Sequence, residues 1–148
     1  MEQHPIWQEF ILQAQTIKTK LQATLAQIAS THQLTVHQLL VLIGIQNCQV
    51  MTVGDVTKEL MILQANASAL CKRMEEQGYV RRIRNEQDER VVNVVLDHKG
   101  HAILQEIVAD ISERYHKHVL TSIDISLIYR GFQEWNRMIA LLEGEQHE

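Results

Sequence analysis

Apolar residues near the start of the chain recur at steps of three and four. They are Trp7, Phe10, Ala14, Ile17, Leu21, Leu25 and Ile28. This spacing places them on one stripe of an α-helix. Pro5 stands where such a helix could begin, because the first turn leaves that N–H unpaired in any case. The pattern therefore predicts a helix of about seven turns, long enough to pack against a partner subunit.

Two capping motifs predict where the next two helices start. Thr35 is followed three residues later by Gln38, and Thr52 is followed three residues later by Asp55. In such a box the first side chain accepts a hydrogen bond from the fourth residue's N–H, and the fourth side chain accepts one from the first residue's N–H. Residues 39–43 are apolar, so we expect the helix that starts at Thr35 to be central in the core.

A fourth helix is predicted over residues 64–77, and Gly78 is expected to end it, since glycine is common just past a helix. Its apolar positions should face the core, and they are Ala67, Leu70, Cys71 and Met74. Its outward face carries the polar and basic residues Gln64, Asn66, Ser68, Lys72 and Arg73. Two alternating segments, 79–84 and 91–96, then predict a hairpin with a polar tip. Helix, turn, helix and hairpin in this order form the winged helix-turn-helix pattern.

Two further helices are predicted after the hairpin. Asp97 is a suitable N-cap for the first, and Thr121 with Asp124 forms a capping motif for the second. We therefore expect a mainly α fold with a small β-hairpin wing. We expect a single domain over residues 1–148, with the winged helix-turn-helix core at about 35–96 and flanking helices at about 5–30 and 98–143.

The predicted fourth helix suits the major groove of DNA, which admits one helix and presents hydrogen-bond donors and acceptors on its base edges. Gln64, Asn66 and Ser68 crowd its first turn, the part of a recognition helix that meets the bases. Lys72 and Arg73 lie further along and can hold the phosphate backbone. We predict that these five residues bind DNA.

The predicted hairpin carries Arg82, Arg84 and Arg90 near its tip. A thin ribbon with Arg at its end can enter the minor groove, whose narrow walls concentrate negative potential. Asp88 is expected either to accept a hydrogen bond from the turn or to hold Arg90 in position. We therefore add Arg84, Asp88 and Arg90 to the predicted DNA-binding residues.

The net charge of −4 argues against a protein that coats nucleic acid indiscriminately. Cys48 and Cys71 are far apart and form no CxxC motif, which fits a reducing cytoplasm and no disulfide framework. The first residues show no signal-length apolar run, and no stretch reaches membrane-spanning length. We expect a cytoplasmic protein with no membrane partner.

Enzyme motifs are missing from the sequence. The glycines are too widely spaced for a P-loop or a dinucleotide-binding loop, and neither HExxH nor GxSxG occurs. His98 with His101, and His116 with His118, lack Cys or carboxylate partners at a standard ligand spacing. We predict no catalytic residues, no cofactor and no metal site.

With these elements in place, the chain resembles the MarR family of bacterial transcription regulators. The resemblance lies in the Thr52–Leu60 helix, in NASALCKRMEEQGYVRR and in QDERVVNVVLDHKG. Asp88, Arg90, Leu96, Lys99 and Gly100 fit the family's wing pattern, and Asp97 stands where the family usually has Thr. Both residue types cap helices.

This resemblance implies a homodimer joined by the first, fifth and sixth helices. It also implies double-stranded DNA with a near-palindromic operator as target, and a regulator, either a repressor or an activator, whose DNA affinity responds to a small-molecule effector. Two alternatives with the same fold are a regulator that senses a metal ion and a regulator that senses oxidation. A third is a winged-helix adaptor that binds proteins and does not read DNA.

Overall fold

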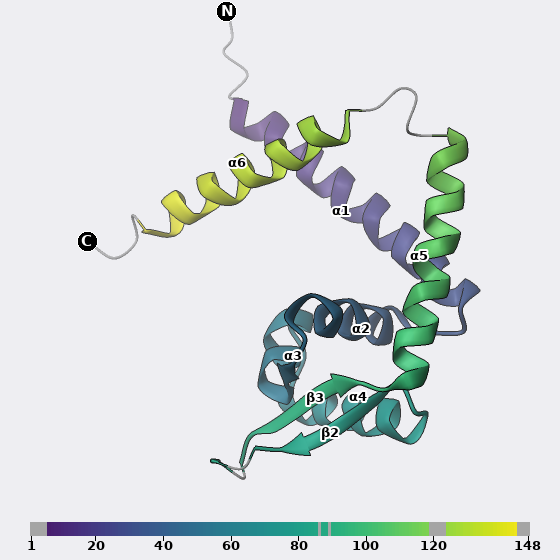
Figure 1. Cartoon of the computed structure of the whole chain (residues 1–148). Helices are drawn as coiled ribbons and strands as arrows, with labels where there is room; N and C mark the ends of the chain where they lie inside the picture. The colour runs from purple at the N-terminus through teal and green to yellow at the C-terminus, as the bar shows by residue number, and fades with distance from the viewer. Residues whose placement is uncertain (1–5, 86, 89, 119–123, 145–148) are drawn as a thin grey trace, which may run out of the picture. The chain divides into compact units, whose positions relative to one another are not determined.

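The computed structural model describes residues 6–85, 87–88, 90–118 and 124–144, so the predicted roles of Pro5 and Thr121 lie outside the described residues (Figure 1). The chain forms two compact units, residues 1–108 and 109–148. The first unit contains α1 (Ile6–Thr31), α2 (Val36–Cys48), β1 (Met51–Thr52), α3 (Val53–Leu60), α4 (Gln64–Glu76), β2 (Val80–Arg84) and β3 (Val92–Leu96). Helix α5 (His98–His118) runs from the first unit into the second, which also holds α6 (Ile125–Gly144).

The core of the first unit is built around α2, as the apolar run after Thr35 predicted. Leu39 and Leu42 are fully buried, and Val41 and Ile45 are almost so. Helix α2 contacts α1, α3 and the sheet, which explains why its face shows no polar stripe. The helix therefore serves as the support on which the other elements of this unit are placed.

Both predicted capping boxes are confirmed. Thr35 Oγ1 accepts a hydrogen bond from the Gln38 N–H at 3.2 Å, and Gln38 Oε1 accepts one from the Thr35 N–H at 2.8 Å. At the start of α3, Thr52 Oγ1 accepts from the Asp55 N–H at 3.0 Å, and Asp55 Oδ2 accepts from the Thr52 N–H at 2.8 Å. Each box satisfies N–H groups that the first turn of a helix leaves unpaired.

The sheet has three strands, whereas the sequence predicted two. Strand β3 lies in the middle and pairs antiparallel with β2 on one side and with β1 on the other. In the short β1–β3 pair, Met51 lies opposite Val94 and Thr52 opposite Asn93. A two-residue strand has no alternation to detect, so no local pattern could predict β1. Its pairing ties the start of α3 to the root of the wing.

The end of α4 is fixed by contacts to both the hairpin and α5. Gly78 adopts a φ of +80°, a conformation that costs glycine little and other residues more, as expected for a helix end. The Lys99 Nζ donates a hydrogen bond to the Gln77 carbonyl at 3.1 Å and lies 4.4 Å from the centre of the Tyr79 ring. Lys99 thus satisfies a carbonyl at the negative end of the α4 dipole.

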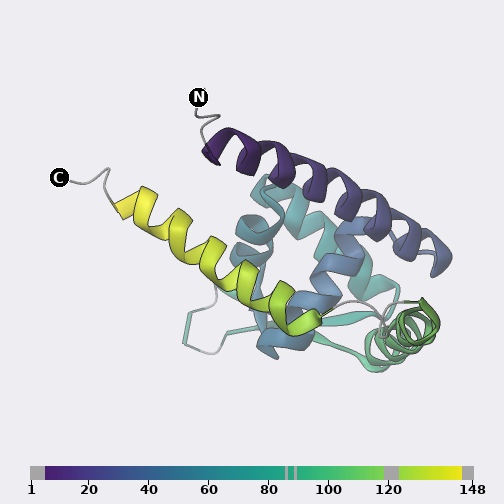
Figure 2. The ribbon, with the colours of Figure 1, turned by 90° about the horizontal axis from the view of Figure 1, so that it is seen from above.

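Helices α1 and α6 each carry many apolar side chains that the chain itself leaves exposed. On α1 they are Trp7, Ile11, Leu12, Ile17 and Leu21. On α6 they are Ile125, Leu127, Ile128, Tyr129, Phe132, Met138, Ile139 and Leu141. Figures 1 and 2 show each of the two as a single unbroken helix. Exposed apolar surface on this scale is typical of a protein–protein interface.

One residue of the motif predicted at the start of α6, Asp124, lies within the described residues. The Asp124 Oδ1 accepts hydrogen bonds from the N–H groups of Ser126 at 2.9 Å and Leu127 at 3.1 Å, so Asp124 itself caps the helix. Among the described helices, none alone is long and apolar enough to span a membrane. Helices α1 and α2 meet that test only together, across a bend of 92°, and α2 belongs to the buried core.

Candidate nucleic-acid interface

Helices α3 and α4 are joined by a tight turn at residues 61–63. Met61 has left-handed backbone angles, and the Ile62 N–H donates a hydrogen bond to the Thr57 carbonyl at 3.2 Å. The side chains of Met61 and Leu63 are exposed. The turn ends α3 and starts α4 at Gln64, so it sets the direction of the predicted recognition helix.

Helix α4 buries the four predicted apolar residues and exposes most of its polar ones. Ala67, Leu70, Cys71 and Met74 are buried. Gln64, Asn66, Lys72 and Arg73 are exposed, and Ser68 is half-buried. At about 100° per residue, Gln64 and Ser68 lie on one flank of the exposed surface and Asn66 and Arg73 on the other. The five residues therefore surround the exposed surface of α4 and do not form one row.

Small residues occupy the outermost positions in the first two turns of α4, a feature absent from the predicted site. Ala65 and Ala69 are exposed and lie one turn apart, between the two polar flanks. Without a long side chain there, the helix backbone can approach the floor of a groove closely, and the methyl groups can contact thymine methyls. The signal in the sequence was the four-residue spacing of two Ala on the polar side of the helix.

A groove of about 350 Å³ lies between α4 and the wing. Its lining residues come from the start of α3, the first turns of α4 and both wing strands, and include Thr52, Gly54, Gln64, Ser68, Arg82 and Arg90. Gln64 and Ser68 thus face the wing. The structure brings these two predicted site residues together with Arg90, which lies more than twenty residues away in the chain.

Arg82 holds the wing against α4. Its N–H donates a hydrogen bond to Glu75 Oε1 at 2.9 Å, and its Nη1 lies 3.8 Å from Glu75 Oε2. Its Nε is buried without a hydrogen-bond partner in the structure. A buried donor without a partner costs free energy unless water or a ligand satisfies it. Arg82 therefore anchors the wing through Glu75 and also lines the groove between α4 and the wing, although the predicted set of site residues omitted it.

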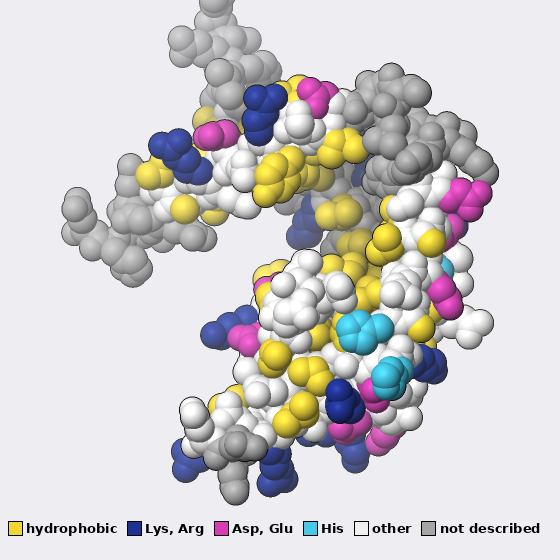
Figure 3. Space-filling model, in the orientation of Figure 1, with side chains coloured by type: hydrophobic (Ala, Val, Ile, Leu, Met, Phe, Trp, Pro, Cys, Tyr) yellow, Lys and Arg dark blue, Asp and Glu magenta, His cyan; other side chains and the backbone are white. Residues whose placement is uncertain are grey.

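A second groove, of about 510 Å³, is lined by Glu75, Arg82, Arg84, Arg90 and Val92. Three arginines of the hairpin therefore converge on one side of it. Figure 3 shows Lys and Arg side chains gathered around the lower end of the first unit, at the hairpin. Lys72 and Arg73 line neither groove and lie further along α4. The wing thus concentrates positive charge that the net charge of the chain does not reveal.

The tip of the wing is a hydrogen-bonded turn. Asp88 Oδ1 accepts from the main-chain N–H of Arg90 at 3.0 Å, and Asn85 Oδ1 accepts from the Gln87 N–H at 2.8 Å. Of the two roles expected for Asp88, the structure provides the one in the turn: the bond goes to the Arg90 main chain. Asp88 therefore fixes where the Arg90 side chain leaves the backbone.

The two cysteines differ in exposure. Cys71 is buried on the inner face of α4, and burial raises the pKa of its thiol, while the nearby Arg82 charge partly opposes that effect. Cys48, at the end of α2, is exposed. Within the part of the chain that the structure describes, no three His, Cys, Asp or Glu side chains gather as a metal site would require. The side chains of His116 and His118 lie outside the described set.

Comparison with known proteins gives two kinds of match. A family profile described as "Transcriptional regulator SarA/Rot" matches residues 23–107. The HTH-type transcriptional regulator TtmR of Methylorubrum extorquens (strain PA1) is 35% identical over 72 residues, which are 49% of this chain and 37% of TtmR. The chain thus spans little more than a third of the length of that relative.

Solved structures match over almost the whole chain at low identity. AbsC, a MarR family transcriptional regulator from Streptomyces coelicolor, has a TM-score of 0.73 and 17% identity, covering 97% of this chain and 99% of AbsC. A structure of reduced AbfR bound to DNA has a TM-score of 0.70 and 18% identity, covering 95% and 96% of the two chains. The predicted fold class and the resemblance to MarR-family proteins are confirmed.

Proposed function

The chain belongs to the SarA/Rot family of transcriptional regulators, and we propose that it regulates transcription by reading DNA with α4 and the β2–β3 wing together. The observation that carries this proposal is the groove that Gln64 and Ser68 of α4 share with Arg82 and Arg90 of the wing. One duplex backbone running along this groove would place α4 in the major groove and the wing in the adjacent minor groove. The DNA in the AbfR structure supports this use of the fold.

Each site residue has a role that follows from its place. Gln64, Asn66 and Ser68 read base edges from the first turns of α4, with Asn suited to adenine. Lys72 and Arg73 bind phosphates further along the helix, outside the two grooves. Arg84 and Arg90 enter the minor groove, and Asp88 positions Arg90 through the turn of the wing.

The regulator acts as a homodimer on a near-palindromic operator. The exposed apolar side chains of α1 and of α6 support this, because burying apolar surface in a dimer interface is favourable in water. Two copies of α4 related by a two-fold axis would meet half-sites about one helical turn, ~10 bp, apart. The flanking helices over about 5–30 and 98–143 would then form the dimer, and residues 35–96 the DNA-binding core.

The protein is a cytoplasmic repressor that responds to a small molecule and catalyses no reaction. Two free cysteines fit a reducing compartment. The proposed target, DNA, lies in the bacterial cytoplasm. A cavity beside α3 supports effector binding, since α3 leads directly into α4. An effector that binds one arrangement of α3 more tightly than another would change the affinity of α4 for its operator.

A salt titration tests DNA binding and separates it from the adaptor alternative. Fluorescence anisotropy with a labelled duplex should show affinity falling steeply as salt rises, with a slope of roughly −0.9 for each phosphate contact. An adaptor that uses this surface for proteins would bind the duplex weakly at low salt and show little slope. That result would refute the proposed function.

Asn66→Ala tests base reading by α4. Loss of the Asn66 amide should reduce the preference for the operator over an operator changed at one base pair by ~1–3 kcal/mol. The affinity for random DNA should stay nearly unchanged. Arg90→Ala is the comparison, because loss of a wing contact should weaken binding to operator and random DNA alike. Equal losses on both DNAs for Asn66→Ala would contradict its role in base reading.

A further inference from the structure

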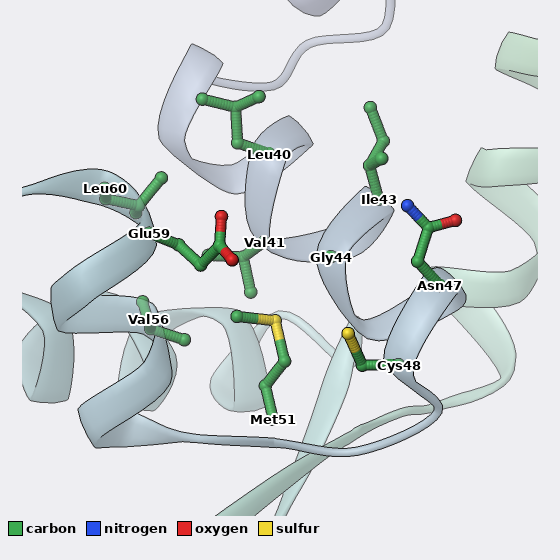
Figure 4. Close-up of a pocket in the computed structure, with 10 residues that line it drawn as sticks. All are labelled: Leu40, Val41, Ile43, Gly44, Asn47, Cys48, Met51, Val56, Glu59 and Leu60. Carbon is green, nitrogen blue, oxygen red and sulfur yellow. The ribbon is translucent and has the colours of Figure 1, made fainter. Parts of the chain in front are cut away.

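A cavity of about 220 Å³ lies between α2, β1 and α3, away from the grooves beside the wing. Figure 4 shows its ten lining residues: Leu40, Val41, Ile43, Gly44, Asn47, Cys48, Met51, Val56, Glu59 and Leu60. Val41, Met51 and Val56 are buried, whereas Leu40, Ile43 and Leu60 are half-buried. The walls are therefore mainly hydrocarbon, with polar groups at the rim.

Gly44 makes room for the Met51 side chain in this cavity. A Cβ on Gly44 would lie 2.7 Å from Met51 Sδ, so the side chain could not keep its place beside any larger residue. Met51 is flexible and polarisable, and methionine adapts its shape to different apolar ligands. The cavity therefore has one wall that can adjust to what it binds.

Glu59 gives the cavity its charge. Among the ten described residues that line it, Glu59 alone is ionic, and Figure 4 shows its carboxylate directed into the space between α2 and α3, near Val41 and Met51. Within the described residues it forms no ion pair, and the charge of the neighbouring Lys58 acts on Asp55. The carboxylate of Glu59, which is exposed and has no ion-pair partner among the described residues, thus lies at the rim of a mainly apolar cavity.

We propose that this cavity binds a small organic cation with an apolar body, such as an arylalkylammonium ion, with its body against Val41, Met51 and Val56 and its positive group on Glu59. A neutral ligand that covered Glu59 would remove water from the carboxylate and leave it uncompensated. An anionic ligand would be repelled at short range. A cation forms a charge-assisted hydrogen bond with the carboxylate while its apolar part leaves water.

Binding here would act on α4 through α3. Val56, Glu59 and Leu60 belong to α3, whereas the facing walls belong to α2 and β1, so a ligand favours one separation of α3 from α2. Only residues 61–63 separate the end of α3 at Leu60 from the start of α4 at Gln64. This regulatory step rests on the proposed function, but ligand binding in the cavity does not.

NMR titration of protein labelled at the methionine methyl groups tests the site directly. Three probes of similar size differ in charge: phenethylammonium, 2-phenylethanol and phenylacetate. The Met51 methyl resonance should move and saturate with phenethylammonium, and the other two probes should bind at least tenfold more weakly. Met61, which is 90% exposed and lies outside the cavity, is the internal control and should not respond. Equal binding of all three probes, or no response of Met51, would overturn the proposal.

Glu59→Gln keeps the size of the side chain and removes its charge. It should weaken phenethylammonium at least tenfold and leave 2-phenylethanol unchanged, whereas Glu106→Gln, an exposed carboxylate on α5, should alter neither. Unchanged cation affinity in Glu59→Gln overturns the assigned ligand class. Operator affinity of the same variants without a probe is measured separately. Failure to bind DNA would refute the proposed function and the regulatory step, while the NMR result would still decide the cavity.

Discussion

Gly100, in the first turn of α5, lies directly against the main-chain carbonyl oxygen of Tyr79. A Cβ at position 100 would overlap that oxygen, which also accepts a hydrogen bond from the Asp97 N–H at 3.0 Å. The contact joins the end of α4, the root of the wing and the start of α5. It gives a physical reason for the Lys-Gly pair at residues 99–100, because only glycine permits this approach.

Gly100→Ala should therefore destabilise the fold by roughly 1–3 kcal/mol, since the added methyl group meets backbone that cannot easily move. Urea denaturation followed by circular dichroism measures the change. Gly54→Ala on α3 is the matched control. A Cβ there would meet only Thr52 Oγ1 at an ordinary 3.4 Å, and alanine is the better helix former. If both variants were equally stable, the contact between residues 79 and 100 would be looser than described.

Arg82→Ala should weaken binding to all duplex DNA and reduce the salt slope by about 0.9, because one phosphate contact is lost. Arg81→Ala is the control, because Arg81 precedes Arg82 on the same strand but lines neither groove. The Arg81 Nε instead lies 3.7 Å from Asp97 Oδ1. Fluorescence anisotropy at several salt concentrations distinguishes the two. A larger slope change for Arg81 than for Arg82 would reverse the assignment.

The cap of α3 should make stability depend on pH in the acid range. Hydrogen bonds from the Thr52 main chain and then its side chain hold the pKa of Asp55 below its ordinary value of 3.8. A carboxyl group whose pKa is lowered by folding contributes stability above the unfolded pKa and loses it as pH falls through the folded pKa. Asp55→Asn should therefore be less stable than the natural protein at neutral pH, with the difference shrinking below about pH 4.

Thr52→Val separates the two sources of that effect. It should cost ~0.5–2 kcal/mol by removing the hydroxyl cap of α3. It keeps the main-chain N–H that donates to Asp55 at 2.8 Å, so most of the acid dependence should remain. Urea unfolding across the acid range measures both variants. A pH dependence abolished by Thr52→Val would assign it to the hydroxyl.

Cys48 and Cys71 should react with a thiol reagent at very different rates. Cys48 is exposed, whereas burial closes off Cys71 and raises the pKa of its thiol, which lowers the fraction of reactive thiolate. In the folded protein a maleimide should label one thiol per chain quickly and the second only on unfolding. Mass spectrometry of the labelled peptides identifies the site. Rapid labelling of Cys71 would favour the redox-sensing alternative.

The sequence by itself determined the features that depend on neighbours in the chain. The capping boxes at Thr35 and Thr52, the buried face of α4 and the end of α4 at Gly78 were all predicted correctly. Hydrogen bonds between residues three apart and a period of 3.6 residues are local properties, so local reasoning suffices for them.

Only the tertiary structure decided which distant residues meet. The pairing of β1 with β3, the hold of Glu75 on Arg82, and the place of Glu59 beside Met51 join segments whose separation along the chain carries no signal of contact. The sequence placed Arg82, Arg84 and Arg90 near the tip of the wing, and packing gave Arg82 an anchored position while leaving Arg84 and Arg90 exposed. Folding places such side chains through the burial of the whole core, and no short segment contains that information.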